Sequence, residues 1–471
     1  MPDTCQYSSS CRVTLSGVTL SPNDSRADSL AALRFPAVRW LLLSGVSESL
    51  ASRALAVVIG YQLYRVTHSP LALGWLGLVE AIPALGLALF GGHFADRGFA
   101  SGEGRRRIVL FTRAVMLLAA LLMSFFSAGE TVNLAALYAL VFMSGLARGF
   151  GDPAASAFEM QVVPAAVYVN AASWLGSASL GAAMLGPAVG GFSFDLLRAH
   201  GAYLLIAALQ LVALVAIWWV PVAYTPPVEE KGEQEPIWDS IRAGLNFVRR
   251  DQVLLGSMAL DLFAVLFGGA VALLPIFADD ILKVGASGLG FLVAAPSVGA
   301  LVVTLWSTRR PPTRNAGRIL LVSVAGFGVS IIVFALSHTF WLSLVALVFS
   351  GGFDGISMVI RRSIVRLRTP AHLRGRVASV SLLFIGSSNE IGAFESGFAA
   401  SLLGTVRSVW LGGLVTLAVV GVSAWRLPEL RRLSLAGLGL AGLGGSGPDL
   451  TESDEKIAAE KELQQGKTAG G

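Results

Sequence analysis

Twelve long apolar segments fill most of this chain and decide what it can fold into. They lie at about 38–64, 71–94, 108–127, 133–152, 170–194, 202–222, 252–275, 288–308, 318–337, 340–360, 377–403 and 408–426. A bilayer-spanning helix takes about 20 apolar residues, so each segment is long enough to cross a membrane. Only 14% of the residues are charged and the mean hydropathy is +0.68, which excludes an ordinary soluble protein. We therefore predict an all-α membrane protein with twelve transmembrane helices.

Basic residues are distributed unevenly among the segments that connect these helices. If the N-terminus is cytoplasmic, the cytoplasmic segments carry 28 of the 35 Lys and Arg residues. The outer loops carry only Arg65, Arg198, Lys283 and Arg407. Loops rich in Lys and Arg stay in the cytoplasm, so we expect a multi-pass protein of the cytoplasmic (inner) membrane with both termini inside. The positive net charge is thereby explained, and no nucleic acid partner is needed.

Composition divides the chain into five regions. We expect a disordered cytoplasmic leader at 1–35, a six-helix bundle at 36–222, a cytoplasmic linker at 223–250, a second six-helix bundle at 251–428 and a disordered cytoplasmic tail at 429–471. The leader lacks the apolar core of a signal peptide. In the linker, Trp238, Ile241, Leu245 and Val248 share one face of a helix whose other face is polar, which predicts a helix lying along the membrane surface.

The two bundles share an internal repeat. At a constant offset of 206 residues, the segment from Ser144 falls on that from Ser350, Pro164 falls on Pro370, and Gly191 falls on Gly397. The ungapped register over about 50 residues predicts two pseudo-symmetric halves with a cavity between them, as transporters with internal repeats have.

Two motifs resemble those of the major facilitator superfamily. The segment GGHFADRG from Gly91, followed by GRRR from Gly104, resembles the superfamily's loop between its second and third helices. The resemblance implies that this loop gates the transporter through Gly92, Asp96, Arg97, Arg105 and Arg106. Phe94 stands where the family usually has Leu, and about five extra residues follow Asp96.

The segment GPAVGG is similar to a motif of the superfamily's antiporters and consists here of Gly186, Pro187, Gly190 and Gly191 around two variable positions. A proline-kinked helix packed through small residues is the alternative interpretation. Segments at Thr67, Arg368 and Ser388 resemble the subgroup that contains the enterobactin exporter and the macrolide efflux proteins.

Charged residues inside the predicted spans indicate the mechanism, because each costs about 3 kcal/mol at mid-bilayer unless it faces a cavity or a partner. The proton-coupling candidates are Glu48, our first choice, with Glu80, Asp261 and Glu390. The candidate charge partners are Arg53, Arg148, Asp354 and Glu395. Arg148 and Asp354 occupy equivalent repeat positions, so they either pair across the cytoplasmic gate or bond within their own halves. Arg53 lies about 140° around the helix from Glu48, so we expect it to meet Glu80 or another span instead.

The remaining sequence features limit the function. Cys5 and Cys11 lie in the polar leader, and five scattered His residues offer no pattern typical of a metal site. No phosphate-binding GxxxxGK[ST] motif occurs, which excludes direct use of ATP, and we expect no enzyme activity. The interpretation is a proton-coupled exporter of a siderophore, a macrolide or another amphipathic drug. We expect a small-molecule substrate, lipid contact, a monomer, and no cofactor, with the proton gradient as energy source. The alternatives are a proton-independent facilitator or a membrane signalling protein.

Overall fold

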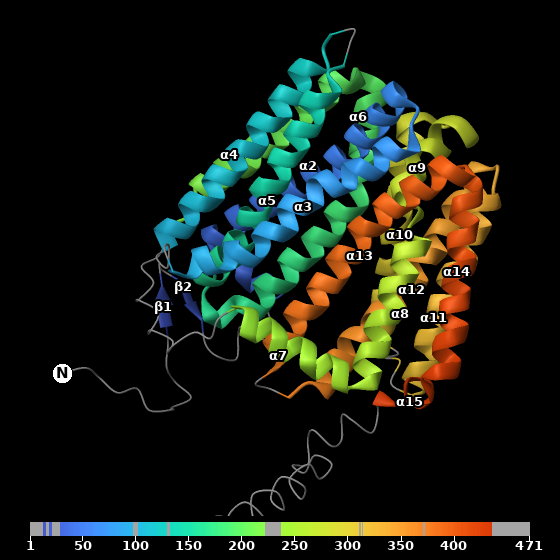
Figure 1. The fold of residues 1–471 in the computed structure, drawn as a ribbon. Helices are drawn as coiled ribbons and strands as arrows, with labels where there is room; N and C mark the ends of the chain where they lie inside the picture. The colour runs from blue at the N-terminus through green and yellow to red at the C-terminus, as the bar shows by residue number, and fades with distance from the viewer. Residues whose placement is uncertain are drawn as a thin grey trace, which may run out of the picture.

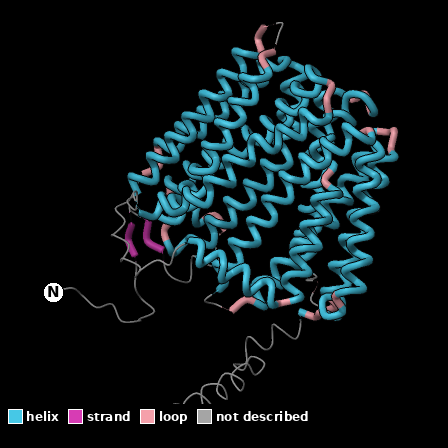
Figure 2. Tube along the Cα trace, viewed as in Figure 1, coloured by secondary structure: helices cyan, strands magenta, loops and turns pink. Residues whose placement is uncertain are grey.

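The chain is almost entirely helical in its described parts (Figure 2). The structure is a computed structural model, and it describes residues 13–15, 18–20, 29–97, 102–129, 132–221, 237–309, 312, 314–370 and 373–435. Apart from helices it contains one antiparallel pair of short strands, β1 (Val13–Leu15) and β2 (Val18–Leu20), in which Val13 faces Leu20. This pair stands in the leader, where we expected no regular structure. The rest of the predicted leader lies outside the described residues, except for the segment from residue 29 onward.

The N half consists of long antiparallel helices. They are α2 (Pro36–Thr67), α3 (Pro70–Arg97), α4 (Gly102–Phe126), α5 (Leu134–Val162) and α6 (Tyr168–Trp218), with the 3-10 helices η1 (Ala31–Arg34) and η2 (Ala165–Val167). Helix α6 has 51 residues and is interrupted at Arg198, whose φ of 57° and ψ of −177° are not helical. The predicted fifth and sixth spans are the two arms on either side of this kink.

The C half begins with α7 (Ile237–Arg250), the helix predicted in the linker. It continues with α8 (Gln252–Gly268), η3 (Ala270–Leu273), α9 (Leu274–Ile276) and the π-helix η4 (Phe277–Ile281), then α10 (Gly285–Arg309), α11 (Ala316–Leu336), α12 (Phe340–Arg368), α13 (Arg374–Leu403), α14 (Thr405–Arg426) and α15 (Pro428–Arg432). The predicted seventh span is thus broken after Gly268 instead of running as one helix.

Helix bounds repeat between the halves. Helices α5 and α12 each have 29 residues, and their first and last residues are related by the offset of 206 found in the sequence. The same offset relates the first residue of α6 to that of α13. It also relates the kink at Arg198 to Gly404, whose φ of 86° separates α13 from α14. The internal repeat is therefore a repeat of structure.

Nine helices among the described residues are long and apolar enough to cross a membrane. One of them contains both arms of α6, whereas α3 contributes only the shorter apolar stretch Pro70–Ala84. Helix α13 runs through the C half beside α8 (Figure 1). The number of twelve membrane crossings stays a prediction. The helices found here are compatible with it.

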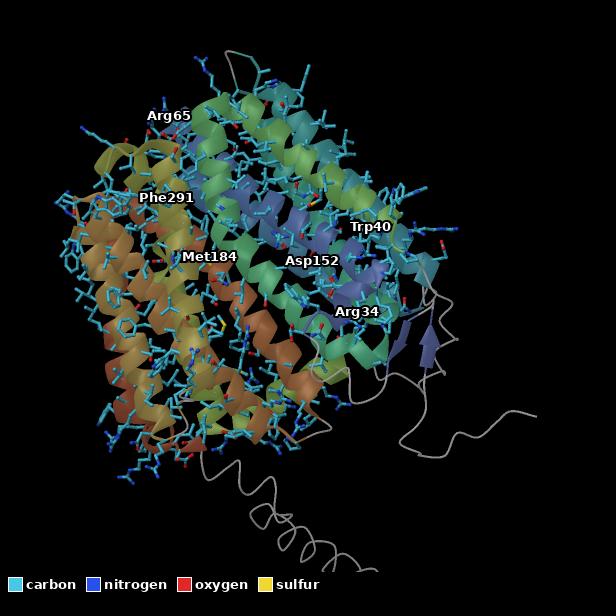
Figure 3. The ribbon with its side chains drawn as sticks, turned by 180° about the vertical axis from the view of Figure 1, so that it is seen from behind. Arg34, Trp40, Arg65, Asp152, Met184 and Phe291 are labelled. Atoms are coloured by element: carbon cyan, nitrogen blue, oxygen red, sulfur yellow. The ribbon has the colours of Figure 1, made fainter. Side chains whose placement is uncertain are left out.

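The bundle has two distinct ends. Helices α7 and α15 lie at one end, and α9 lies at the other with the turn between α2 and α3 (Figure 1). We call these the α7 end and the α9 end. Arg34 and Arg65 lie toward these opposite ends (Figure 3). Helix α7 packs on α13, because Gly244 approaches the Arg376 carbonyl and Val248 is buried with Val377. The side chains of Trp238 and Ile241 lie outside the described part, and of the predicted tail the structure describes only the segment up to residue 435, where Leu430 and Leu433 are buried.

Candidate functional site

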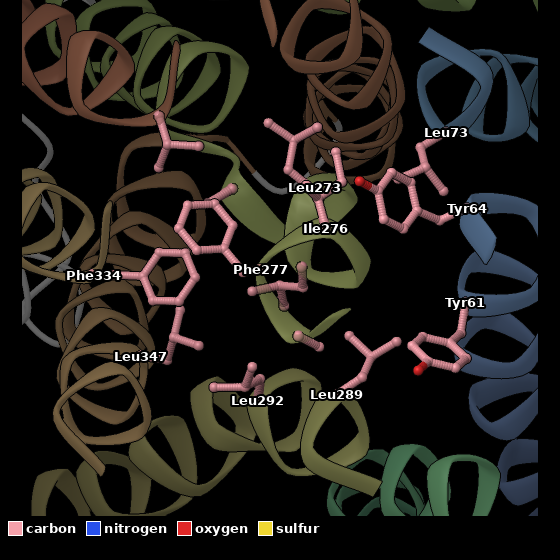
Figure 4. Packing of buried hydrophobic residues seen from close by; sticks show 14 of the residues in the cluster. Tyr61, Tyr64, Leu73, Leu273, Ile276, Phe277, Leu289, Leu292, Phe334 and Leu347 are labelled. Carbon is pink, nitrogen blue, oxygen red and sulfur yellow. The ribbon is translucent and has the colours of Figure 1, made fainter. Parts of the chain in front are cut away.

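An apolar cluster joins the two halves at the α9 end. Tyr61 and Tyr64 of α2 face Leu273, Ile276 and Leu289 of the C half (Figure 4). All five side chains are less than 5% exposed. Such packing excludes water between the halves, so the space between them is closed at this end.

Hydrogen bonds to carboxylates surround that cluster. Tyr61 Oη donates to Asp279 Oδ1 at 2.7 Å, and the Tyr64 hydroxyl donates to Asp280. Arg65 lies 3.8 Å from Asp279, measured from Nη1 to Oδ1. Asp279 and Asp280 belong to the π-helix η4, a form that occurs mostly as single turns and frequently at functional sites.

The antiporter-like glycines form a second contact between the halves at this end. Gly191 abuts the Ala286 carbonyl of α10, and a Cβ on Gly290 would lie 2.5 Å from the Pro187 carbonyl oxygen. One turn further on, Asp195 accepts hydrogen bonds from the Ser287 N–H at 2.8 Å and the Ser287 hydroxyl. It also accepts the Ala286 N–H at 3.3 Å, so it caps the first turn of α10 from the other half. The glycines of GPAVGG thus lie at close helix contacts, and the antiporter interpretation of the motif stays a prediction.

A central cavity of about 570 Å³ lies between the halves, below these contacts. Its apolar walls come from both halves and include Val57, Leu73, Leu76, Val265, Leu289, Phe327, Ile331 and Leu347. Its charged lining residues are Arg53, Glu80, Asp354 and Glu390. A volume of this size suits a drug-sized ligand.

A second pocket, of about 310 Å³, adjoins this cavity in the N half and is lined mainly by polar residues. Ion pairs satisfy three of its four acids, Glu48, Glu80 and Asp152. Glu48 Oε1 lies 3.0 Å from Arg113 Nη1, and Glu80 Oε1 lies 2.5 Å from Arg148 Nη1. Arg148 Nε also lies 3.9 Å from Asp152 Oδ2, so this arginine serves two carboxylates.

A third pocket, of about 530 Å³, lies in the C half and leads from the central cavity toward the α7 end. It shares Asp354 and Asn389 with the central cavity and reaches Arg374 at the start of α13. Arg361 pairs here with Asp261, and its Nη2 lies 3.5 Å from Asp354 Oδ1. The predicted tenth span ended at 360, but α12 continues to Arg368 and places Arg361 inside the helix.

Arg53 and Glu390 differ from the other charged residues of the cavity. Both line the central cavity and the N-half pocket, yet no hydrogen bond or ion pair joins either one to another described residue. We expected Arg53 to meet Glu80 or another span. Arg148 pairs with Glu80 instead. The expectation that Arg53 would not pair with Glu48 is consistent with the Glu48–Arg113 contact.

The structure brings seven of the eight charged residues predicted inside the spans to these three pockets, and Glu395 is the exception. Arg148 and Asp354 each bond within their own half in this conformation. Glu395 lines only a small pocket of about 10 Å³ beside Phe267 and Leu273. Among the described residues, no group of His, Cys, Asp and Glu has the arrangement of a metal site.

The predicted gating loop is only partly described. Gly92, Asp96 and Arg97 lie in the last turns of α3. The side chains of Asp96 and Arg97 are outside the described part. Arg106 donates to the Trp218 carbonyl at the end of α6, and Arg105 lies in the first turn of α4.

Sequence reasoning missed several residues of the site. Arg113 and Arg361 were not among the predicted charge partners, although opposite charges in neighbouring spans could have indicated them. Tyr61, Tyr64, Asp195, Asp279 and Asp280 were missed as well. Their signal is weak, because acids and tyrosines near span ends are common at membrane surfaces.

Comparison with known proteins gives the family. Residues 41–393 match the Major Facilitator Superfamily. The chain is 24% identical over 402 residues to the enterobactin exporter EntS of Shigella boydii serotype 4 (strain Sb227), covering 84% of this chain and 93% of that protein. It is also 24% identical over 401 residues to the protein of the same name from Escherichia coli O157:H7 (strain EC4115 / EHEC), with the same coverage.

Solved structures share the fold. A bacterial homolog of the human lysosomal transporter Spinster, in an inward-facing and unoccupied conformation, matches with a TM-score of 0.66 and 14% identity over 84% of this chain and 96% of that one. A D-xylose–proton symporter matches with a TM-score of 0.61 and 14% identity over 87% of this chain and 100% of that one. With a family match over three quarters of its length, this multi-pass membrane protein belongs to the Major Facilitator Superfamily.

Proposed function

We propose that this chain is a proton-coupled exporter of a small amphipathic organic molecule that works by alternating access. The class is set by its family, whose members are transport proteins and not enzymes. Export is supported by the relatives named as exporters. A siderophore, a macrolide or another amphipathic drug remains the proposed substrate range. The protein takes no cofactor in this proposal, and the proton gradient supplies the energy.

The conformation supports alternating access. The halves are joined at the α9 end by an apolar cluster and by hydrogen bonds, while the central cavity continues toward the α7 end. We assign the α7 end and both termini to the cytoplasm of the inner membrane, because the basic residues concentrate there. The structure then corresponds to the state that takes up substrate from the cytoplasm.

The single observation that carries the proposal of proton coupling is the position of Glu390 in the central cavity, without an ion pair to another described residue. Of the four candidate carboxylates, Glu48, Glu80 and Asp261 each contact an arginine. Glu390 has no ion pair with a described residue and lines the cavity where substrate would bind. A carboxylate without a cationic partner in an apolar cavity binds a proton more readily than a paired one. We therefore propose Glu390 as the proton carrier in place of Glu48.

The test uses purified protein in liposomes that contain a pH-sensitive dye. Siderophores, macrolides and cationic dyes are added singly under an imposed pH gradient, and proton flux and substrate movement are both recorded. We expect substrate-dependent proton flux in the wild type and its loss in Glu390→Gln. Glu395→Gln is the matched control, because Glu395 lies on the same helix away from the central cavity, and it should retain flux.

Three other outcomes would contradict the proposal. Substrate movement without proton flux would indicate a facilitator, and the cavity carboxylates would then be structural. Binding without movement of any compound would favour a signalling protein. Full proton coupling in Glu390→Gln together with its loss in Glu48→Gln would return the carrier role to Glu48.

A further inference from the structure

The central cavity holds two opposite charges, neither of which has a hydrogen bond or ion pair with another described residue. Of its charged lining residues, Glu80 is satisfied by Arg148, and Asp354 lies beside Arg361. Arg53 on α2 and Glu390 on α13 remain, and they come from opposite halves. The guanidinium of Arg53 carries N–H donors and no acceptor, so this residue presents donors to the cavity.

Neighbouring glycines fix the space around both residues. A Cβ on Gly186 would lie 2.5 Å from the Arg53 Cβ and 3.4 Å from its Cγ, so only glycine admits the Arg53 stem at this packing distance. A Cβ on Gly77 of α3 would lie 3.4 Å from Glu390 Oε2, which places that carboxylate against the opposite half. The two charges are therefore held at built positions on a cavity whose other walls are largely apolar.

We propose that Arg53 and Glu390 are the two poles of the substrate site, and that the preferred substrate is an amphipathic dipolar molecule. Its carboxylate binds the Arg53 guanidinium, its protonated amine binds the Glu390 carboxylate, and its apolar body contacts the walls around Phe327 and Ile331. This inference rests on the proposed transport function and names the substrate chemistry of that same site.

The two poles have different roles in coupling. A proton on Glu390 removes the charge that the amine needs, so proton and substrate exclude each other, which is the requirement for antiport. Arg53 contributes affinity and selectivity, and the exchange with the proton takes place at Glu390. A purely anionic substrate would behave in the opposite way, because protonation of Glu390 would favour its binding beside Arg53.

The experiment measures binding of three naphthyl probes that differ only in their polar end. They are 2-(2-naphthyl)ethylamine, 3-(2-naphthyl)propionate and 3-(2-naphthyl)alanine, titrated into purified protein in nanodiscs with proton release recorded in weakly buffered solution. We expect the amino acid to bind about tenfold more tightly than either single-charge probe, since each charge-assisted contact is worth about 1.4 kcal/mol. Its binding should release protons.

Variants separate the two poles. Arg53→Gln should lower the affinity for the amino acid to that for the amine, with affinity for the amine unchanged, whereas Arg53→Lys should keep part of the preference. Glu390→Gln should lower affinity for the amino acid to that for the propionate and abolish proton release. Arg426→Gln, which removes an exposed charge at the end of α14, is the matched control and should change neither quantity.

Several results would overturn the inference. Equal affinity of the wild type for all three probes, no binding of any probe, or a preference for the propionate accompanied by proton uptake would each exclude a dipolar site. An unchanged preference in a folded Arg53→Gln protein would remove the role of Arg53. Proton flux with substrate in liposomes is measured separately, so a failure of this inference can be distinguished from a failure of the transport proposal.

Discussion

The two ends of the bundle satisfy their polar groups in different ways. At the α9 end, carboxylates of one half bind donors of the other, as Asp195 does with Ser287 and Asp279 does with Tyr61. Toward the α7 end, the ion pairs between described residues stay within one half, as in Glu80–Arg148 and Asp261–Arg361.

This difference shows how the halves can separate at low cost. The contacts that cross between them at the α9 end are the apolar cluster, neutral donors bonded to carboxylates, and backbone packing through glycines. The one ion pair between described residues there, Arg65–Asp279, has an arginine whose side chain is exposed. The charges deeper in each half keep their partners when the halves move, so no buried ion pair has to break. Rigid halves with a breakable contact at one end are what alternating access requires.

The strongest way to break the α9 end is a side chain at Gly191. A Cβ there would collide with the Ala286 carbonyl, so Gly191→Leu should open this end. Overpacking of a tight contact costs about 2 kcal/mol, which corresponds to about a 30-fold shift in the population of the two states. The assay uses a protein in which Cys5 and Cys11 are replaced and Ser350→Cys places a thiol in the central cavity. In right-side-out vesicles, we expect labelling of this thiol by a membrane-impermeant reagent to rise accordingly.

Gly181→Leu is the control for that variant. Gly181 lies on the same helix, and a Cβ there would meet nothing within 4 Å. Labelling of Ser350→Cys should therefore stay at the level of the unmodified background. An equal rise in both variants would show that α6 tolerates no added bulk, and the packing of Gly191 would not explain the effect.

Removal of the cap on α10 should give a smaller effect. Asp195→Ala loses the acceptor for two N–H groups of the first turn, and loss of a helix cap costs about 1 kcal/mol, or about a fivefold change in population. The same labelling assay measures it. Ser287→Ala keeps the backbone cap and should change labelling less. If Asp195→Ala labels no faster than the parent, the cap does not hold this end closed.

The architecture was largely predictable because it follows from hydrophobicity and repetition. The repeat in the sequence predicts equivalent helix bounds, and α5 and α12 match it at both ends. The amphipathic pattern of the linker likewise predicts α7. The junction at Arg198 was not predictable as a single non-helical residue between two helices, since a polar residue between two apolar runs indicates a longer loop equally well.

The partners of the charged residues were much less predictable. Their presence in the spans was clear, but ion pairing depends on which faces of two distant helices meet. Arg113 reaches Glu48 from α4, a helix for which we predicted no charge partner. Arg361 was assigned to a loop because the apolar run ends before it, although the helix continues for two more turns. Arg53 and Glu390 have no ion pair with another described residue, and this depends on the positions of all their neighbours together.

The smallest effect concerns the α7 end when it closes. Arg148 and Asp354 occupy equivalent positions in the repeat and bond within their halves in this conformation. If they pair in the opposite conformation, Arg148→Gln and Asp354→Asn should be non-additive in transport rate. A partly exposed ion pair is worth about 0.5 kcal/mol, so the coupling should be about twofold. A control double-mutant cycle combines Arg148→Gln with Glu395→Gln, two residues that do not contact each other. Their effects on transport rate should be additive. Additivity in the first cycle as well would mean that these charges serve only their own halves and that the gate at the α7 end closes without them.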